Sequence, residues 1–365
     1  MNTNKLIAAV AVAGSAIFAM PANAETFTFT TNDVTWTYTI KNSQCYLGTG
    51  TDGSPAMPTN TALDASMIPW TFTDESGITR VCDVIGGYTF KNCTGLTGKL
   101  LIPAYIRYLG NYCFNNSGIE CAIVEARQTI SNNDMTGSGV FLECRSVKGI
   151  LFKGAGPINM FHEFENSTAL KLVVFGPEIS KRNDKKASGE AAFSGVSGCK
   201  IFYSASQASW SSNSHVPDWN NNEVIAYGAG RDFDMQFSDK EDVVTFVPTT
   251  ANALTNTLAW APLFKENLGL NSKVVITNAI EAVEGTITSE LLANVSFDSL
   301  SFAVKTQAQL DMVLDAVPVE TPLSIDPTGA TENLTVMTEN RKIYVLLPTN
   351  GTYRLTKRGL VIIVE

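Results

Sequence analysis

Short apolar runs recur along the middle of the chain, and each follows a phenylalanine at a nearly constant distance. The phenylalanines are Phe90, Phe114, Phe141, Phe164 and Phe193, so neighbouring copies are 23 to 29 residues apart. The runs that follow them are Leu96 to Ile102, Ile119 to Val124, Val147 to Phe152, Leu170 to Phe175 and Cys199 to Tyr203. A period of roughly 20 to 29 residues is typical of a solenoid that adds one strand per turn. The pattern therefore predicts a stack of about five coils.

Two other positions around each phenylalanine are restricted. The fourth residue before it is glycine in four copies, Gly86, Gly110, Gly137 and Gly189, and Met160 in the other. The second residue after it is Asn92, Asn116, Glu143, Asn166 or Gly195. Glycine and asparagine favour tight turns, so each unit is expected to run as turn, short coil around the phenylalanine, then strand.

Alternation with period two assigns a face to each residue of the predicted strands. The inward pairs are Leu100/Ile102, Ala122/Val124, Ile150/Phe152, Val173/Phe175 and Ile201/Tyr203. The outward residues are then Leu101, Ile123, Leu151, Val174 and Phe202. These five, stacked about 4.8 Å apart, predict an apolar stripe that binds a partner or another part of this chain. A slip of register by one residue would instead turn them inward.

The regions on either side of the repeats have different patterns. Strict alternation in Thr26 to Phe29 and Thr35 to Ile40 predicts strands that cap the first coil, within a cap spanning 25–80. The repeats are expected over 81–204 and an irregular last coil or linker over 205–222.

The remaining residues, 223–365, predict a second domain that is rich in β-structure and has two helices. One helix runs from about Asn252 to Leu268 and stops at Gly269; the other begins with the capping pattern Thr306-x-x-Gln309 and ends near Ala316. The strands are expected at Val243 to Val247, Lys273 to Thr277, Ser299 to Val304, Leu334 to Met337, Ile343 to Leu347 and Leu360 to Val364. The fold class is thus mainly β with short helices.

The first copies of the repeat carry a family resemblance. The segment Ile85-Gly86-Gly87-Tyr88-Thr89-Phe90-Lys91-Asn92-Cys93-Thr94-Gly95-Leu96, followed by Leu101-Ile102-Pro103 and Leu109-Gly110, resembles the repeat of BspA-like leucine-rich-repeat proteins of bacterial surfaces. The resemblance extends from about Ile68 to Tyr203. It implies a secreted or surface-attached protein, such as an adhesin, with no shared catalytic residue set.

The N-terminus has the pattern of a secretory signal. Lys5 is followed by an apolar run from Leu6 to Phe18 and by Ala22-Asn23-Ala24, so cleavage is expected after Ala24. The run is shorter than the roughly 18 to 20 residues that span a bilayer, which argues against a membrane anchor. The mature protein is expected to be secreted, periplasmic or at the cell surface, without a transmembrane segment.

The net charge of the chain limits the kinds of molecule that it is expected to bind. Against 35 acidic residues the chain has 26 lysines and arginines, giving a formal net charge of −9. Nucleic acid requires a basic surface, so it is not an expected partner. A protein or a glycan remains.

Seven cysteines in an exported chain permit disulfides, although the odd number leaves at least one unpaired. Cys45 and Cys82 lie in the predicted cap, where a bond between them is one possibility. Cys93 and Cys144 follow the repeat phenylalanine and are expected to be buried thiols. The pairing of Cys113, Cys121 and Cys199 stays open, and no spacing predicts a metal or cofactor.

Candidate catalytic residues are sparse. His162 and His215 are the only histidines, and neither belongs to a nucleophile motif. The acidic group Asp232, Asp234, Asp239, Glu241 and Asp242 fits no calcium loop, and the run from Lys181 to Lys186 is expected to be a surface loop. The sequence therefore favours a non-enzymatic interaction protein. The alternative is an exported enzyme or carbohydrate-binding protein with its site in the C-terminal domain, for which a cleft containing Trp260 and an acidic pair would be the sign.

Overall fold

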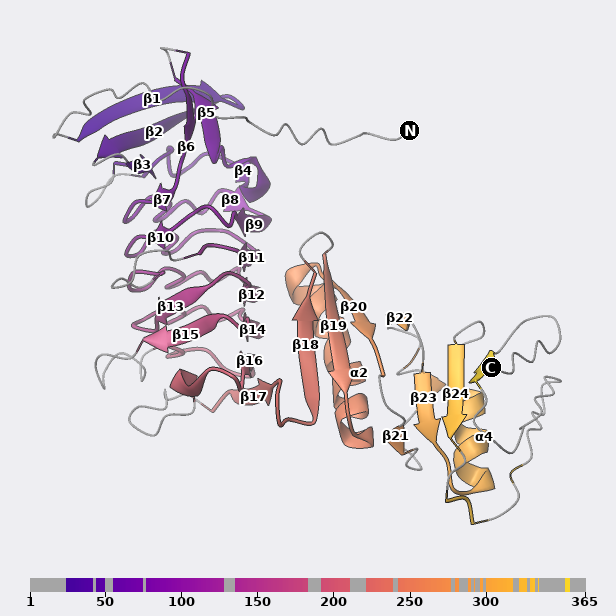
Figure 1. Ribbon diagram of the computed structural model, residues 1–365. Coiled ribbons are helices and arrows are strands. Elements are labelled where there is room, and N and C mark those ends of the chain that lie inside the picture. The colour runs from indigo at the N-terminus through magenta and orange to yellow at the C-terminus, as the bar shows by residue number, and fades with distance from the viewer. Residues whose placement is uncertain are drawn as a thin grey trace.

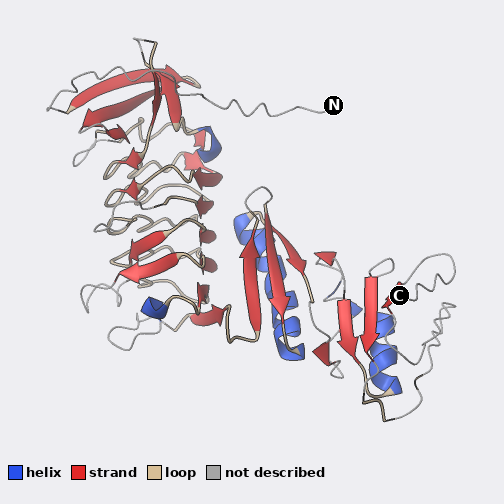
Figure 2. Cartoon of the chain, in the orientation of Figure 1, coloured by secondary structure: helices blue, strands red, loops and turns tan. Residues whose placement is uncertain are grey.

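The described part of the chain is mainly β-structure, with α-helices α2 and α4 in its C-terminal region (Figure 1 and Figure 2). The computed structural model describes residues 24–41, 44–49, 55–74, 77–127, 135–182, 192–210, 221–238, 242–276, 280–281, 288–289, 292, 296–297, 300–317, 322–326, 329–331, 334 and 352–354. The expected signal segment, His215, Asp239, Glu241 and the predicted strands after Leu334 therefore lie outside the described residues, apart from Ala24.

The N-terminal cap contains a five-stranded sheet of order β1-β2-β3-β7-β10. Its strands are β1 (Glu25–Thr31), β2 (Val34–Lys41), β3 (Gln44–Leu47), β7 (Val84–Ile85) and β10 (Tyr108–Leu109). Strands β1 and β2 confirm the two predicted strands, and β1 to β3 pair antiparallel, whereas β7 and β10 already belong to the repeats and pair in parallel. Trp36 of β2 is fully buried and packs edge-on against Phe90, the first repeat phenylalanine. The cap thus covers the end of the repeat core.

The repeats build a six-stranded parallel sheet with one strand from each unit. Its strands in chain order are β9 (Lys99–Ile102), β11 (Cys121–Val124), β12 (Gly149–Phe152), β14 (Leu172–Phe175), β16 (Lys200–Ser204) and β17 (Glu223–Tyr227). The first five match the predicted runs. The register confirms the predicted alternation, because Leu100, Ala122, Ile150 and Val173 are aligned in one column and are all fully buried.

The repeat phenylalanines form a continuous ladder inside this stack. All five are fully buried, and the rings of Phe90, Phe114, Phe141 and Phe164 follow one another at centroid distances of 5.0, 5.7 and 6.5 Å. Phe193 continues the ladder 4.9 Å from Phe164. The regular spacing of the phenylalanines along the chain therefore produces a core in which each ring packs on the ring of the next unit.

Backbone conformation explains the residues that flank each phenylalanine. The second residue after it, Asn92, Asn116, Glu143, Asn166 or Gly195, has a positive φ in every copy, between 52° and 75°. Asparagine and glycine tolerate this left-handed region best. The asparagines also bond along the stack, since Asn116 Nδ2 donates to Asn92 Oδ1 at 3.0 Å.

The glycines before the phenylalanine serve close approach between units. A Cβ at Gly110 would lie 2.4 Å from the backbone nitrogen of Gly87, and one at Gly137 would lie 2.5 Å from that of Asn111. Any side chain at these positions would therefore separate neighbouring units.

Short sheets complete the repeat region. They consist of β13 (Gly156–Asn159) with β15 (Ile179–Arg182), β4 (Leu63–Asp64) with β8 (Leu96–Thr97), and β5 (Thr71–Thr73) with β6 (Thr79–Val81). Two 3-10 helices accompany them, η1 (Ala65–Met67) and η2 (Ala208–Trp210). Lys181 and Arg182 belong to β15, so the expected surface loop is wrong at these two residues, while 183–191 lie outside the described residues.

The C-terminal region contains two strand–helix–strand units. In the first, β18 (Phe233–Phe237) precedes β19 (Val243–Pro248), α2 (Ala251–Leu268) and β20 (Asn271–Val274), with β22 (Ser296–Phe297) beside β20. In the second, β21 (Ile280–Glu281) lies beside β23 (Leu300–Ala303), followed by α4 (Gln307–Ala316), β24 (Pro322–Asp326) and β25 (Thr352–Arg354).

Both predicted helices are confirmed, together with their termini. Helix α2 ends at Gly269 in the left-handed conformation, and α4 begins with the capping box of Thr306 and Gln309. The two units also share a pattern: Phe246 and Phe302 are each followed four residues later by a capping threonine, Thr250 or Thr306, and then by a buried leucine.

One predicted boundary is wrong. The second domain was expected to begin at residue 223, but β17 pairs in parallel with β16 and adds a sixth strand to the repeat sheet. No repeat phenylalanine precedes β17, so the spacing of phenylalanines gave no sign of this sixth strand. The side chain of Tyr227 closes this end, with its hydroxyl donating to the Phe175 carbonyl at 2.8 Å.

Candidate binding site between the repeat sheet and helix α2

The five residues of the predicted apolar stripe align in one column of the repeat sheet. Leu101 pairs with Ile123, Ile123 with Leu151, Leu151 with Val174, and Val174 with Phe202. Their exposure differs sharply: Leu101 is 45% exposed, whereas the other four are at most 4% exposed. The four buried residues belong to a core cluster separate from that of the phenylalanines, so the predicted register is right and another segment covers these four.

Helix α2 of this same chain is the cover. It packs on β11, β12 and β14, and its Trp260 and Phe264 contact the ring of Phe202 at 5.3 and 5.7 Å. The 18 residues of α2 span about 27 Å, which is enough to cross the four strands β11, β12, β14 and β16. The prediction that the stripe binds an external partner is therefore wrong at Ile123, Leu151, Val174 and Phe202, because α2 of this chain already covers these residues.

A close approach of α2 and two lysine contacts of the neighbouring strands hold the C-terminal region on the sheet. Gly149 lies under the end of the helix, where a Cβ would be 2.4 Å from the Asn267 carbonyl oxygen. Lys153 donates to the Ser238 carbonyl at 2.6 Å, and Lys99 lies 3.4 Å from the Asp242 carboxylate. Both lysines come from the repeat sheet, so they hold the end of β18 and the start of β19 against it.

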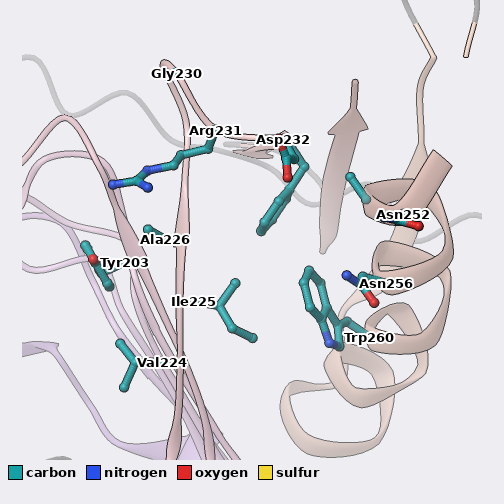
Figure 3. Close-up of a pocket in the computed structure, with 12 residues that line it drawn as sticks. Tyr203, Val224, Ile225, Ala226, Gly230, Arg231, Asp232, Asn252, Asn256 and Trp260 are labelled. Carbon is teal, nitrogen blue, oxygen red and sulfur yellow. The ribbon is translucent and has the colours of Figure 1, made fainter. Parts of the chain in front are cut away.

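A pocket of about 500 Å³ opens where α2 begins, beside the last strands of the repeat sheet. The chain enters it from β17, turns through Gly230, and leaves along β18, while the first three turns of α2 form the opposite side (Figure 3). The turn is tight, because Gly228 and Gly230 have φ of 100° and 75° and the Arg231 amide donates to the Gly228 carbonyl.

Apolar side chains line the inner part of the pocket. They include Ile225, Ala226, Phe233, Ala253 and Trp260, whereas Tyr203 and Val224 line it from the side that packs against the repeat core. Trp260 is 9% exposed and packs against Phe202 and Phe233, so one part of its indole belongs to the core and another reaches the pocket. An aromatic group held in this way is rigid before any ligand arrives.

Four polar side chains surround this apolar part. Arg231 and Asp232 come from the turn after β17, and Asn252 and Asn256 come from α2, where they share a face with Trp260 at intervals of four residues. All four polar residues are exposed. Within the described part of the chain, their side chains make no hydrogen bond or ion pair, which leaves amide, carboxylate and guanidinium groups available to a ligand.

The sequence pointed to Trp260 and Asp232 as candidate site residues, but not to Arg231, Asn252 or Asn256. The i, i+4, i+8 spacing of Asn252, Asn256 and Trp260 was a usable signal, since it places three functional groups on one helix face. The position of the turn containing Arg231 could not be obtained in this way, because it depends on β17 joining the repeat sheet.

The other candidate groups are dispersed. His162 interacts with Glu165 in the turn before Phe164, and Asp242 faces Lys99. Asp234 is not among the residues that line the pocket, where Asp232 is the sole carboxylate in the described lining. No group of three or more His, Cys, Asp or Glu residues in the described ranges is arranged to hold a metal ion.

Cys93 and Cys144 are buried free thiols, as expected, and the cysteines within the repeats serve packing. Burial raises the pKa of Cys93 and Cys199 to about 12 and that of Cys144 to about 11. Thiols with such values stay protonated near neutral pH and are poor nucleophiles.

Comparisons with known proteins give no direct assignment: no family model, curated protein or solved structure matches the chain. Among the residues that the structure describes, no helix combines the length and hydrophobicity needed to cross a bilayer.

Proposed function

We propose that this chain is an exported bacterial leucine-rich-repeat protein of the BspA-like type, and that it binds a glycan in the pocket between β17 and α2. The observation that carries the proposal is the pocket itself, which is lined by part of the Trp260 indole and by Arg231, Asp232, Asn252 and Asn256, whose side chains have no hydrogen-bond or ion-pair partner among the described residues.

The leucine-rich-repeat assignment is supported by the repeat geometry. Each unit contributes one strand to a parallel sheet in chain order and one phenylalanine to the interior ladder. This arrangement is what a solenoid of stacked units requires. It agrees with the resemblance of the segment from Ile85 to Leu96 to the BspA-like repeat, and the secretory pattern before Glu25 supports export.

The chemistry of the pocket favours a sugar. Sugar rings have an apolar C–H face and a rim of hydroxyl groups, so they suit a site with an aromatic surface and several donors and acceptors. Asn252 and Asn256 each offer both a donor and an acceptor, while Asp232 accepts and Arg231 donates. The volume of about 500 Å³ lies within the range of small-molecule sites.

The same lining supports binding rather than cleavage. Glycoside hydrolysis ordinarily needs two carboxyl groups on opposite sides of the scissile bond. Asp232 has no second carboxylate opposite it among the described lining residues. Helix α2 thus supplies one side of the binding site, and the last repeat strands with the turn after β17 supply the other.

A protein partner is the second candidate, favoured by a different surface. Leu101 is 45% exposed at the end of the stripe that α2 leaves open, and Met67 of the neighbouring η1 is 42% exposed. Contact at these residues would not involve the pocket, so the two candidates are separable.

Binding of glycans to the purified mature chain tests the proposal. A glycan array would identify the ligand, and calorimetry would measure its affinity. Replacing both Asn252 and Asn256 with alanine is expected to raise Kd by about tenfold or more, because each lost hydrogen bond costs about 0.5–1.5 kcal/mol. The matched control is Glu266→Ala, an exposed residue on the same helix that does not line the pocket. Absence of any glycan ligand, or an equal loss in the control, would contradict the proposal.

A further inference from the structure

Two of the seven cysteines lie side by side in the cap. The sulfur atoms of Cys45 and Cys82 are 3.6 Å apart, although the residues are 37 positions apart in the sequence. Cys45 lies in β3, and Cys82 directly precedes Asp83 and β7, the strand that pairs with β3. The pair therefore spans the junction between the cap sheet and the first repeat unit.

Backbone hydrogen bonds hold both cysteines in place. The Cys45 amide donates to the Asp83 side chain at 3.0 Å, the Asp83 amide donates to the Cys45 carbonyl at 3.1 Å, and the Cys82 amide donates to the Trp70 carbonyl at 2.9 Å. Arg107 pairs with the Asp83 carboxylate. Because the backbone is fixed on both sides, the thiols meet without a rearrangement of the strands.

The two thiols are also unequal in access and acidity. Cys82 is fully buried, whereas Cys45 is partly exposed. The hydrogen bond from Cys82 lowers the pKa of Cys45, while that contact and burial raise the pKa of Cys82. Cys45 is thus the thiol that reacts first with a reagent from solution.

The other five cysteines are arranged differently. Cys93, Cys144 and Cys199 direct their sulfur atoms to backbone carbonyls, those of Lys91, Phe114 and Lys200 respectively. Cys113 is fully buried and Cys121 lies in β11. Cys45 and Cys82 are the one pair of thiols in contact within the described part of the chain.

We propose that Cys45 and Cys82 form a disulfide that fastens the cap to the repeats, with an oxidised protein disulfide as the acceptor of the electrons. The Cys45 thiolate attacks a sulfur of that disulfide, which forms a mixed disulfide and releases one acceptor thiolate. The Cys82 thiolate then attacks the Cys45 sulfur and releases the second. One disulfide forms, the acceptor is reduced to a dithiol, and the two protons of the thiols are transferred to it.

The bond would close a loop that includes β4, η1 and the β5–β6 hairpin. A cross-link over such a loop restricts the unfolded chain and so favours the folded state. Its effect would be greatest at the cap, where Trp36 covers the Phe ladder. This proposal does not involve the glycan pocket, so either can fail without the other.

Peptide mapping tests it directly. The mature chain is incubated with oxidised glutathione as a probe disulfide, free thiols are alkylated, and the digest is analysed by mass spectrometry. The expected result is a peptide that joins Cys45 to Cys82, with Cys93, Cys113, Cys144 and Cys199 alkylated only after unfolding. Alkylation of both Cys45 and Cys82 in the oxidised sample, or a different cross-linked pair, would overturn the proposal.

Thermal unfolding provides the second measurement. A reductant is expected to lower the Tm of the oxidised wild type by about 5 °C or more, and to leave the Tm of Cys45→Ala unchanged. Cys121→Ala is the matched control, since this thiol is also partly exposed, and it should keep the full response to reductant. A wild type whose Tm does not respond would count against a stabilising bond, and this comparison needs no folded Cys82 variant.

Discussion

The inner and outer faces of the repeat sheet are both apolar, but different parts of the chain cover them. On the inner face, Ile150 and Val173 pack against the phenylalanines of their own and neighbouring units. On the outer face, Leu151 and Val174 pack against α2, which begins at Ala251, far along the sequence. Neighbouring residues of one strand therefore belong to separate cores.

The inner core is formed by the repeats alone, whereas the outer core, which borders the pocket, also needs α2. The inner core is local, since each unit adds a phenylalanine and a strand to the previous unit, and the spacing in the sequence is enough to predict it. The outer core depends on a long-range contact that no repeat encodes. The pocket lies at the edge of this second core, beside the first turns of α2.

The largest effect is expected on the inner face. Phe141→Ala removes a fully buried ring from the middle of the ladder, between Phe114 and Phe164, and should lower the free energy of unfolding by about 3–5 kcal/mol. Urea denaturation would measure it. Phe27→Ala is the control, because Phe27 is 37% exposed in the cap, and its cost should be much smaller. Equal costs would mean that the ladder is not the main core.

A smaller effect is expected on the outer face, where the chain offers a control in the same column. Leu151→Ala should cost about 2–4 kcal/mol because Leu151 is 1% exposed, whereas Leu101→Ala should cost less than about 1 kcal/mol because Leu101 is 45% exposed. Hydrogen exchange should show lost protection in α2 while the Phe ladder stays protected.

Two outcomes would contradict this picture of the outer face. If Leu101→Ala costs as much as Leu151→Ala, another segment covers both residues. If Leu151→Ala instead exposes the residues around Phe141 and leaves α2 protected, Leu151 belongs to the inner core and the two faces are not separate.

The smallest of these effects concerns a carboxyl group on the inner side. Glu163 is fully buried; its Oε2 accepts from the Val140 amide at 3.2 Å, and its Oε1 has no hydrogen-bond partner within the described residues. Burial raises the pKa of this carboxyl well above its ordinary value. The folded state therefore holds the proton more tightly than the unfolded state. Its contribution to stability is complete below about pH 4.5 and is lost as the pH rises toward the folded pKa.

Glu163→Gln should remove this dependence on pH while preserving the acceptor for Val140. Between pH 5 and pH 6 the wild type is expected to lose stability relative to the variant, by at most about 1.4 kcal/mol. The neighbouring thiols Cys113 and Cys144 have raised pKa values because of their burial, so they do not titrate in this window. Parallel stability curves for the two proteins would show that Glu163 is not buried as a neutral acid.

Much of the local structure could be predicted from the residues themselves. The start of α4 follows from Thr306 and Gln309, the end of α2 follows from Gly269, and the strand ends at Ile102 and Phe175 follow from the apolar runs. These features depend on neighbours in sequence, such as caps, turns and alternation. The predicted domain boundary at residue 223 was wrong, because no repeat phenylalanine precedes β17.

The site was less predictable for the same physical reason. Trp260 and Asp232 were recognisable as residue types, but their meeting with Ile225 depends on where α2 docks. That position depends on the close approach of the helix end to Gly149 and on the apolar contacts of α2 with the outer column.

The sequence by itself determined the repeat and the register of its strands, because spacing and alternation act within a few residues. Only the tertiary structure decided that α2 covers the outer stripe, that a pocket opens at the start of that helix, and that Cys45 meets Cys82. The physical reason is that apolar burial has no direction: a stripe such as Ile123, Leu151 and Val174 requires a cover, and any apolar surface of suitable shape satisfies it.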